Sequence, residues 1–140
     1  TVATSARYVW LRRRDKSEQA VSWWIAGRTG LWMQKLAHDS RALDDLGYDF
    51  DAIDKLRRDT VADESEWQAF FDANSIDPVT IYYEDIVADP IERLGSLSVR
   101  LGGSFAPVVN APDLRNHIQS NVVTRAVHDR YVRELAARVA

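Results

Sequence analysis

The sequence predicts an α/β fold built on a parallel sheet. Two short segments, residues 8–11 (YVWL) and 79–83 (VTIYY), are apolar and rich in aromatic and β-branched residues, as buried strands are. Each is followed by segments with helical periodicity, and strands that alternate with helices pair in parallel. We therefore expect two parallel strands with four or more helices, mostly helical by content. Because both strands are almost wholly apolar, we expect the sheet to be covered on both faces.

The first helix is predicted directly after the first strand. Asp15 and Glu18 have the spacing of a capping box, in which an acid at the helix start bonds the backbone three residues on. Apolar residues at helical spacing then continue to Leu36. Gly27 and Gly30 interrupt this pattern, so the helix is expected to break or bend there.

A second helix is expected after a polar loop. Residues 38–48 are polar and predict the loop, and residues 51–74 predict the helix. Its apolar stripe predicts a buried face made of Ile53, Leu56, Thr60, Trp67, Phe70 and Phe71. The solvated face is expected to carry Lys55, Arg57, Arg58, Asp59 and Asp63.

The remaining helices follow the second strand. Asp89 and Pro90 are typical of a helix start, and Gly102 of its end. Residues 106–112 predict a loop, and residues 113–139 a last helix. Its apolar stripe consists of Leu114, Ile118, Val122, Ala126, Tyr131 and Leu135.

Composition excludes several classes of protein. The 140 residues are 46% hydrophobic and 28% charged, which is ordinary for a folded globular chain. The net charge of −3 argues against a general nucleic-acid binder, which needs a basic surface. The sequence has no cysteine, which excludes disulfides, thiolate zinc sites and a cysteine nucleophile, and a reducing, cytoplasmic setting is expected.

Neither a metal site nor a membrane span is expected. His38, His117 and His128 are not at metal-ligand spacing. The chain also has no apolar stretch of about 18 residues, the length that crosses a bilayer.

The segment that points to chemistry is residues 8–24 (YVWLRRRDKSEQAVSWW), where an apolar strand ends in arginines before a helix. Ligands bind at the carboxyl ends of strands in α/β sheets, and arginine grips phosphate through two hydrogen bonds. Ser22 lies eight residues after Arg14, about 12 Å along a helix, so a long arginine and the serine can reach one phosphate. The alternative is a solvated basic strand end, with Ser22 on an ordinary helix face.

This segment resembles sulfotransferases that use 3′-phosphoadenosine-5′-phosphosulfate (PAPS). In that family a strand, an arginine and a helix with a serine about eight residues later hold the 3′-phosphate of PAPS. The sequence pattern YVWLRRRDK…QAVSWW is similar to that of the bacterial trehalose sulfotransferase branch. Three further segments resemble this branch in the same order: WIAGRTGLW (24–32), YDFDAID (48–54) and IYYEDIVADP (81–90).

The resemblance covers about residues 7–131 and implies a P-loop-type three-layer sulfotransferase fold. Residues 1–140 would then be the C-terminal portion of a single sulfotransferase domain. The Ser/Thr/Gly-rich loop that cradles the phosphosulfate has no counterpart in this sequence, and the family's general base, a glutamate, would precede Thr1. No catalytic residue is therefore assigned here, and the chain by itself is expected to be inactive.

Matched residue by residue, the resemblance assigns four residues of this chain to the binding site of the co-substrate PAPS. The 3′-phosphate arginine is Arg13, counting from the strand, or Arg14, counting back from Ser22. Ser22 supplies the hydroxyl. Tyr83 matches the tyrosine near the adenine, or else is a core aromatic at a strand end.

Two acids after the second strand and two tryptophans are further polar or aromatic candidates for a site. Adjacent residues at a strand end point apart, so Glu84 and Asp85 are expected to cap the following turn rather than share a proton. Most of the five tryptophans are expected in the core, with Trp23 and Trp32 as candidates to face an acceptor sugar.

The function implied by the resemblance is transfer of a sulfuryl group from PAPS to a hydroxyl of a carbohydrate or glycolipid. The partners are then a nucleotide and a sugar-like acceptor, without a metal, and a homodimer is a further possibility. The alternative is a non-enzymatic helical interaction module, and a nucleic-acid binder ranks third because of the acidic balance.

Overall fold

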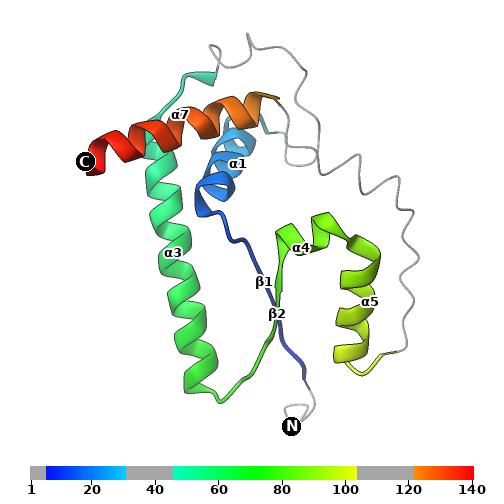
Figure 1. Ribbon diagram of the computed structural model, residues 1–140. Coiled ribbons are helices and arrows are strands. Elements are labelled where there is room, and N and C mark those ends of the chain that lie inside the picture. The colour runs from blue at the N-terminus through cyan, green and yellow to red at the C-terminus, as the bar shows by residue number, and fades with distance from the viewer. Residues whose placement is uncertain (1–5, 31–45, 104–121) are drawn as a thin grey trace. The chain divides into compact units, whose positions relative to one another are not determined.

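The computed structural model describes residues 6–30, 46–103 and 122–140 (Figure 1). The described residues form two parallel strands and five helices, and are mostly helical, as predicted. In chain order the elements are β1 Val9–Arg12, α1 Lys16–Thr29, α3 Phe50–Ala73, β2 Val79–Tyr82, α4 Tyr83–Ala88, α5 Pro90–Arg100 and α7 Val122–Val139.

The chain divides into two compact units. The first, called the strand unit, combines Thr1–Arg14 with Ser65–Ile118 and contains β1, β2, α4 and α5. The second, called the helical unit, combines Asp15–Glu64 with Gln119–Ala140 and contains α1 and α7. The long helix α3 contributes residues to both.

The two strands pair in parallel, which confirms the predicted sheet. Val9 lies opposite Val79 and Arg12 opposite Tyr82, and the Val79 N–H donates to the Tyr8 carbonyl at 2.9 Å. Figure 1 shows β1 and β2 running side by side. This register brings the carboxyl ends of both strands to one edge of the sheet.

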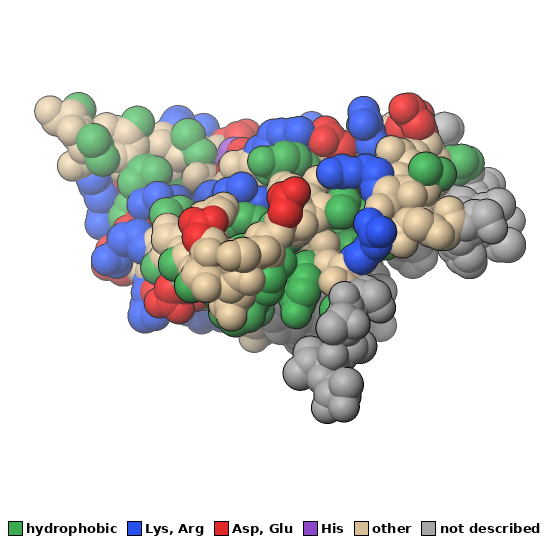
Figure 2. Space-filling view, turned by 90° about the horizontal axis from the view of Figure 1, so that it is seen from below, with side chains coloured by type: hydrophobic (Ala, Val, Ile, Leu, Met, Phe, Trp, Pro, Cys, Tyr) green, Lys and Arg blue, Asp and Glu red, His purple; other side chains and the backbone are tan. Residues whose placement is uncertain are grey.

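One face of β1 is open, contrary to the prediction. Val9 is 41% exposed and Leu11 56% exposed, whereas Trp10 and Arg12 are half-buried. Alternate side chains of a strand point to opposite faces, so only the face of Trp10 and Arg12 is covered within the described structure. Figure 2 shows hydrophobic side chains reaching the surface among basic and acidic ones.

The covered face of β1 packs on the end of α3. The Phe71 ring is buried, with ring centroids 5.3 Å from Trp10 and 6.3 Å from Tyr8. Trp67 and Phe70, which were predicted to be buried, are exposed by 53% and 45%. Instead, the Trp67 ring stacks on Phe71 and the Phe70 ring meets Phe71 edge to face. Phe71 is the residue of this group that contacts β1.

Two helices follow β2 in the strand unit. The strand was predicted to include Tyr83, but Tyr83 is the first residue of α4, which the sequence analysis missed. The next helix, α5, begins as predicted, because the Asp89 carboxylate accepts from the Glu92 N–H at 3.2 Å. Its end also agrees, since Gly102 takes the left-handed conformation at φ +81°.

In the helical unit, α1 begins and ends at predicted residues. The Asp15 carboxylate accepts from the Glu18 N–H at 2.8 Å. The helix ends at Thr29, where Gly30 takes φ +70° and donates its N–H to the Ala26 carbonyl at 2.8 Å. The expected break is therefore confirmed at Gly30, whereas the helix continues through Gly27. Residues 31–36 lie outside the described part of the chain.

The core of the helical unit lies among α1, the first half of α3, and α7. Figure 1 shows α7 beside α1, and these helices are in contact. The second predicted helix is confirmed as α3, displaced by one residue at each end. The buried core consists of Ala20, Val21, Trp24, Ile25, Phe50, Ile53, Val127 and Tyr131.

A polar triad sits within this core. The Tyr131 side chain is fully buried, and its hydroxyl donates to an Asp54 oxygen at 2.8 Å and accepts from Arg57 Nε at 2.9 Å. Arg57 was expected on the solvated face of its helix but is half-buried by this contact. Burial opposes the charge of Asp54, but hydrogen bonds from Tyr131 and Arg57 outweigh it and lower the Asp54 pKa below 3.8.

Some predicted elements lie outside the described residues. These are most of the loop at 38–48, the loop at 106–112 and the start of the last helix at 113–121. Within the described ranges, none of the helices combines the length and the apolar character needed to cross a membrane.

Replacement of Tyr131 by phenylalanine is expected to destabilise the chain by about 1–3 kcal/mol, because Asp54 and Arg57 lose a buried partner. The folded pKa of Asp54 is depressed, so its contribution is present above about pH 4 and lost as the pH falls through the folded value. The difference between wild type and Tyr131→Phe should therefore shrink on acidification. Urea unfolding at pH 7 and below pH 4 measures it, and a difference independent of pH would contradict this account.

Candidate functional site

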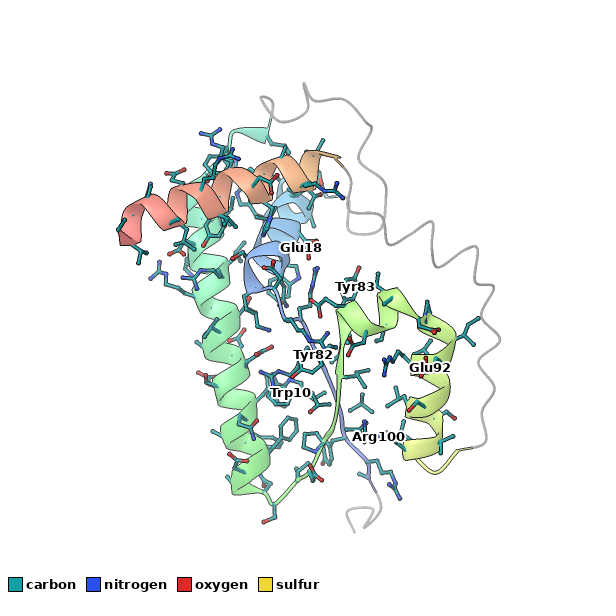
Figure 3. The ribbon with its side chains drawn as sticks, viewed as in Figure 1. Trp10, Glu18, Tyr82, Tyr83, Glu92 and Arg100 are labelled. Atoms are coloured by element: carbon teal, nitrogen blue, oxygen red, sulfur yellow. The ribbon has the colours of Figure 1, made fainter. Side chains whose placement is uncertain are left out.

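Arginines at the end of β1 lie against the rings at the end of β2. The Arg12 guanidinium carbon is 4.3 Å from the Trp10 ring centroid and 5.9 Å from that of Tyr82. The Arg14 guanidinium carbon is 4.1 Å from the same Tyr82 ring. Figure 3 labels Trp10 and Tyr82 on the two strands. The Tyr82 ring is therefore shared by two cations, an arrangement that its negative face stabilises.

Arg13 contacts the next aromatic residue along the chain. Its guanidinium carbon lies 4.4 Å from the centroid of the Tyr83 ring, at the start of α4 (Figure 3). Arg13 Nε lies 3.8 Å from Glu84 Oε1, and the Arg13 side chain is 18% exposed. The structure therefore brings together two of the predicted site residues, Arg13 and Tyr83, in a half-buried setting.

Arg14 is held by two acids of α4. Its Nη1 and Nη2 donate to the two Asp85 carboxylate oxygens at 2.7 and 2.8 Å. Its backbone N–H donates to Glu84 Oε1 at 3.0 Å. The guanidinium and carboxylate therefore meet fork to fork, the geometry that gives the strongest and most directional of such pairs.

This pair shifts the protonation of both partners. The hydrogen bond from Arg14 lowers the Asp85 pKa below its ordinary value, and the bond to Asp85 raises the Arg14 pKa. Both groups are therefore charged throughout the physiological pH range.

Glu84 and Asp85 do not cap a turn, contrary to the prediction. Because β2 runs directly into α4, no turn follows the strand, and both acids fall in the first helical turn. Tyr82 occupies the cap position and makes no capping hydrogen bond through its side chain within the described structure. The two acids instead reach across to the end of β1.

The fourth predicted residue, Ser22, belongs to the helical unit. It is half-buried on α1, and its pairing with an arginine of the strand unit stays a prediction. Trp23 beside it is 43% exposed and Trp24 is buried, whereas Trp32 lies outside the described residues. A contact of Trp23 with an acceptor stays a prediction.

Among the described residues no group of three or more histidine, aspartate or glutamate side chains is arranged to hold a metal ion. His38 and His117 lie outside the described ranges. The nitrogens of His128 lie 3.6 Å from the carboxylates of Asp15 and Asp129.

The sequence as a whole decides the family. The sequence profile described as Stf0 sulphotransferase matches residues 1–134. The chain belongs to the Stf0 sulphotransferase family. The match confirms the sulfotransferase resemblance predicted from the sequence, and spans both strands, both units and the arginine cluster. No curated protein matches the chain.

Membership makes the chain a sulfotransferase-family transferase and implies binding of a nucleotide and of a small acceptor molecule. The residues that sequence reasoning missed are Glu84 and Asp85 as partners of the arginines. The sequence contains a signal for this contact, because three arginines lie at the end of the first strand and two acids follow the second. Parallel strands end at the same edge, so this pattern predicts that the acids and the arginines lie near one another, but it does not fix which arginine pairs with which acid.

The Asp85 carboxyl is expected to titrate below 3.8 in the wild type, because Arg14 stabilises its charged form. Replacement of Arg14 by alanine should raise the Asp85 pKa towards its ordinary value. Carboxyl-carbon NMR of the labelled chain measures this titration. The control is Arg133→Ala, which removes an exposed arginine of α7 and should leave the Asp85 titration as in the wild type. An unchanged Asp85 titration in Arg14→Ala would show that the pair does not form in solution.

Proposed function

We propose that this chain carries the nucleotide 3′-phosphate half of a PAPS-dependent sulfotransferase site. The reaction is transfer of a sulfuryl group from PAPS to a hydroxyl of a carbohydrate or glycolipid. The match of the Stf0 sulphotransferase family over residues 1–134 is the observation that carries this proposal. The arrangement at the strand ends supports it.

The groups at the strand ends suit a nucleotide that bears a ribose phosphate. Guanidinium groups bind phosphate oxygens through paired hydrogen bonds, and an aromatic ring suits a base. Arg13 and Tyr83 supply one of each at adjoining positions, 4.4 Å from guanidinium carbon to ring centroid. The donor set therefore fits the adenosine 3′-phosphate end of PAPS.

The state of Arg14 favours Arg13 as the phosphate ligand. Two of the five guanidinium N–H groups of Arg14 already donate to Asp85 in a fork, and the Asp85 carboxylate beside them repels a phosphate. Arg13 instead lies against the ring of Tyr83, the residue proposed to border the adenine, at 4.4 Å from guanidinium carbon to ring centroid. We therefore assign the 3′-phosphate to Arg13 and give Arg14 a supporting role.

Ser22 is the second proposed phosphate ligand. Its hydroxyl would donate one hydrogen bond to the same phosphate, as the family resemblance implies. Tyr83 is proposed to border the adenine. Such a site would select PAPS over nucleotides without a 3′-phosphate, because those lack the anion that the arginine would bind.

In the reaction, the bond from sulfur to the 5′-phosphate oxygen breaks as a bond from sulfur to the acceptor oxygen forms. The leaving group is adenosine 3′,5′-bisphosphate, and the acceptor proton passes to a general base. The residues of this chain bind and orient the nucleotide. The phosphosulfate loop and the base have no counterpart in the sequence of residues 1–140, so the proposal assigns this chain one half of the site and no catalytic residue.

The test is calorimetric titration of the purified chain with adenosine 3′,5′-bisphosphate and with adenosine 5′-monophosphate. The wild type should bind the bisphosphate more tightly. Arg13→Ala should weaken bisphosphate binding about 10- to 100-fold, the worth of a charged hydrogen-bonded pair, with little effect on the monophosphate. Ser22→Ala should have a smaller effect of the same kind.

Arg133→Ala, which removes an exposed arginine of α7, is the matched control and should leave both affinities unchanged. A folded wild-type chain that binds the two nucleotides equally well would refute the proposed half-site. A loss of selectivity in Arg14→Ala together with full selectivity in Arg13→Ala would move the assignment to Arg14.

A further inference from the structure

Three consecutive residues of one short helix, α4, contact Arg13 and its neighbour Arg14. Tyr83 lies under Arg13, Glu84 contacts both Arg13 and Arg14, and Asp85 holds Arg14. Three consecutive residues of α4 therefore fix two consecutive residues after β1. We propose that Glu84 and Asp85 are positioning residues that hold Arg13 in the orientation required for recognition of a ribose 3′-phosphate. This inference rests on the proposed function.

The backbone contact is the first step of the argument. The amide that joins Arg13 to Arg14 is planar, and its N–H donates to Glu84 Oε1 at 3.0 Å. A hydrogen bond to this N–H fixes the plane of the amide, and with it the backbone torsion on the Arg13 side. The direction in which the Arg13 side chain leaves the backbone is set by that torsion.

The Arg14 side chain is the second step. Its fork to Asp85 anchors Arg14 at 2.7 and 2.8 Å, while the Tyr82 ring supports it at 4.1 Å. An anchor at residue 14 restrains residue 13, because one rigid peptide unit separates them. Side chains held in this way bind with less loss of conformational entropy, which favours the ligand that matches their geometry.

The two roles open to Asp85 predict opposite effects of one substitution. If Arg14 itself bound the phosphate, Asp85 would compete with the ligand, and removing its charge would tighten binding. If Asp85 positions Arg13 through Arg14, removing its charge should weaken binding. The sign of the change in Asp85→Asn therefore distinguishes them.

The first experiment measures the affinities of the chain for adenosine 3′,5′-bisphosphate and adenosine 5′-monophosphate by calorimetry. Asp85→Asn, Glu84→Gln and Arg14→Lys should each lower the preference for the bisphosphate about tenfold, since a displaced ligand-binding group loses its geometry. Arg14→Lys keeps the charge and loses the fork. Glu92→Gln, in the first turn of α5, should retain the wild-type preference, and the exchanged pair Arg14→Asp with Asp85→Arg should recover part of it.

The second experiment needs no ligand. The Tyr83 ring, 4.4 Å from the Arg13 guanidinium carbon, should shift the NMR resonances of the Arg13 side chain away from their random-coil positions. This difference in chemical shift should decrease strongly in Asp85→Asn and Arg14→Lys but not in Glu92→Gln. Circular dichroism confirms that each variant is folded. Unchanged Arg13 signals in Asp85→Asn, or tighter bisphosphate binding, would overturn the positioning role. A wild type without bisphosphate preference, but with chemical-shift differences that decrease in the variants as expected, would refute the proposed function and leave the positioning contact standing.

Discussion

The parallel pairing of β1 with β2 determines which side chains meet at the candidate site. The register sets Arg12 opposite Tyr82, so every residue after these two leaves the sheet at the same edge. On one side the chain continues with two more arginines, and on the other with a tyrosine and two acids. A shift of one residue would exchange the faces of all these side chains. The contacts of Arg13 and Arg14 therefore depend on the ladder of four residue pairs between the two strands.

The fold was largely predictable because its signals are local. The carboxylate caps at Asp15 and Asp89 and the left-handed residues at Gly30 and Gly102 each act within one turn of helix, and a single sequence shows them directly. The exposure of Trp67, by contrast, depends on where the end of α3 meets β1. Apolar periodicity identifies the stripe of a helix but not how much of it another element covers.

The candidate site was predictable in its residues and not in its contacts. The family resemblance named Arg13, Arg14, Ser22 and Tyr83. The structure places Arg13 against Tyr83, and Arg14 against the neighbouring residues Tyr82 and Glu84. The pairing of Arg14 with Asp85 could not be read from either segment, because the two residues are 71 positions apart. The pairing depends on the start of α4 directly after β2. The sequence VTIYY did not predict this boundary, because all five of its residues are typical of a strand.

The Tyr131 triad shows the same limit in the helical unit. Arg57 occupies a helix position whose neighbours Lys55, Arg58 and Asp59 are exposed, and pattern alone places it with them. Arg57 Nε donates a hydrogen bond to the hydroxyl of Tyr131, 74 residues later, and this contact leaves the arginine half-buried. Long basic side chains can cover apolar surface with their methylene groups while the charged end forms a hydrogen bond elsewhere. Helical periodicity therefore predicts the position of the backbone of such a residue better than the position of its charged group.

The near balance of charge at the strand ends has a kinetic consequence. Three arginines stand beside two carboxylates, so the cluster carries about one unit of positive charge at neutral pH. A field of that size is screened within about 8 Å at physiological ionic strength, and it adds little to the capture of anions from a distance. The association rate of a nucleotide should therefore vary little with salt. Nucleotides with more phosphate groups would therefore not associate faster because of their greater charge. Discrimination between nucleotides would depend on the position of the phosphate in the bound state.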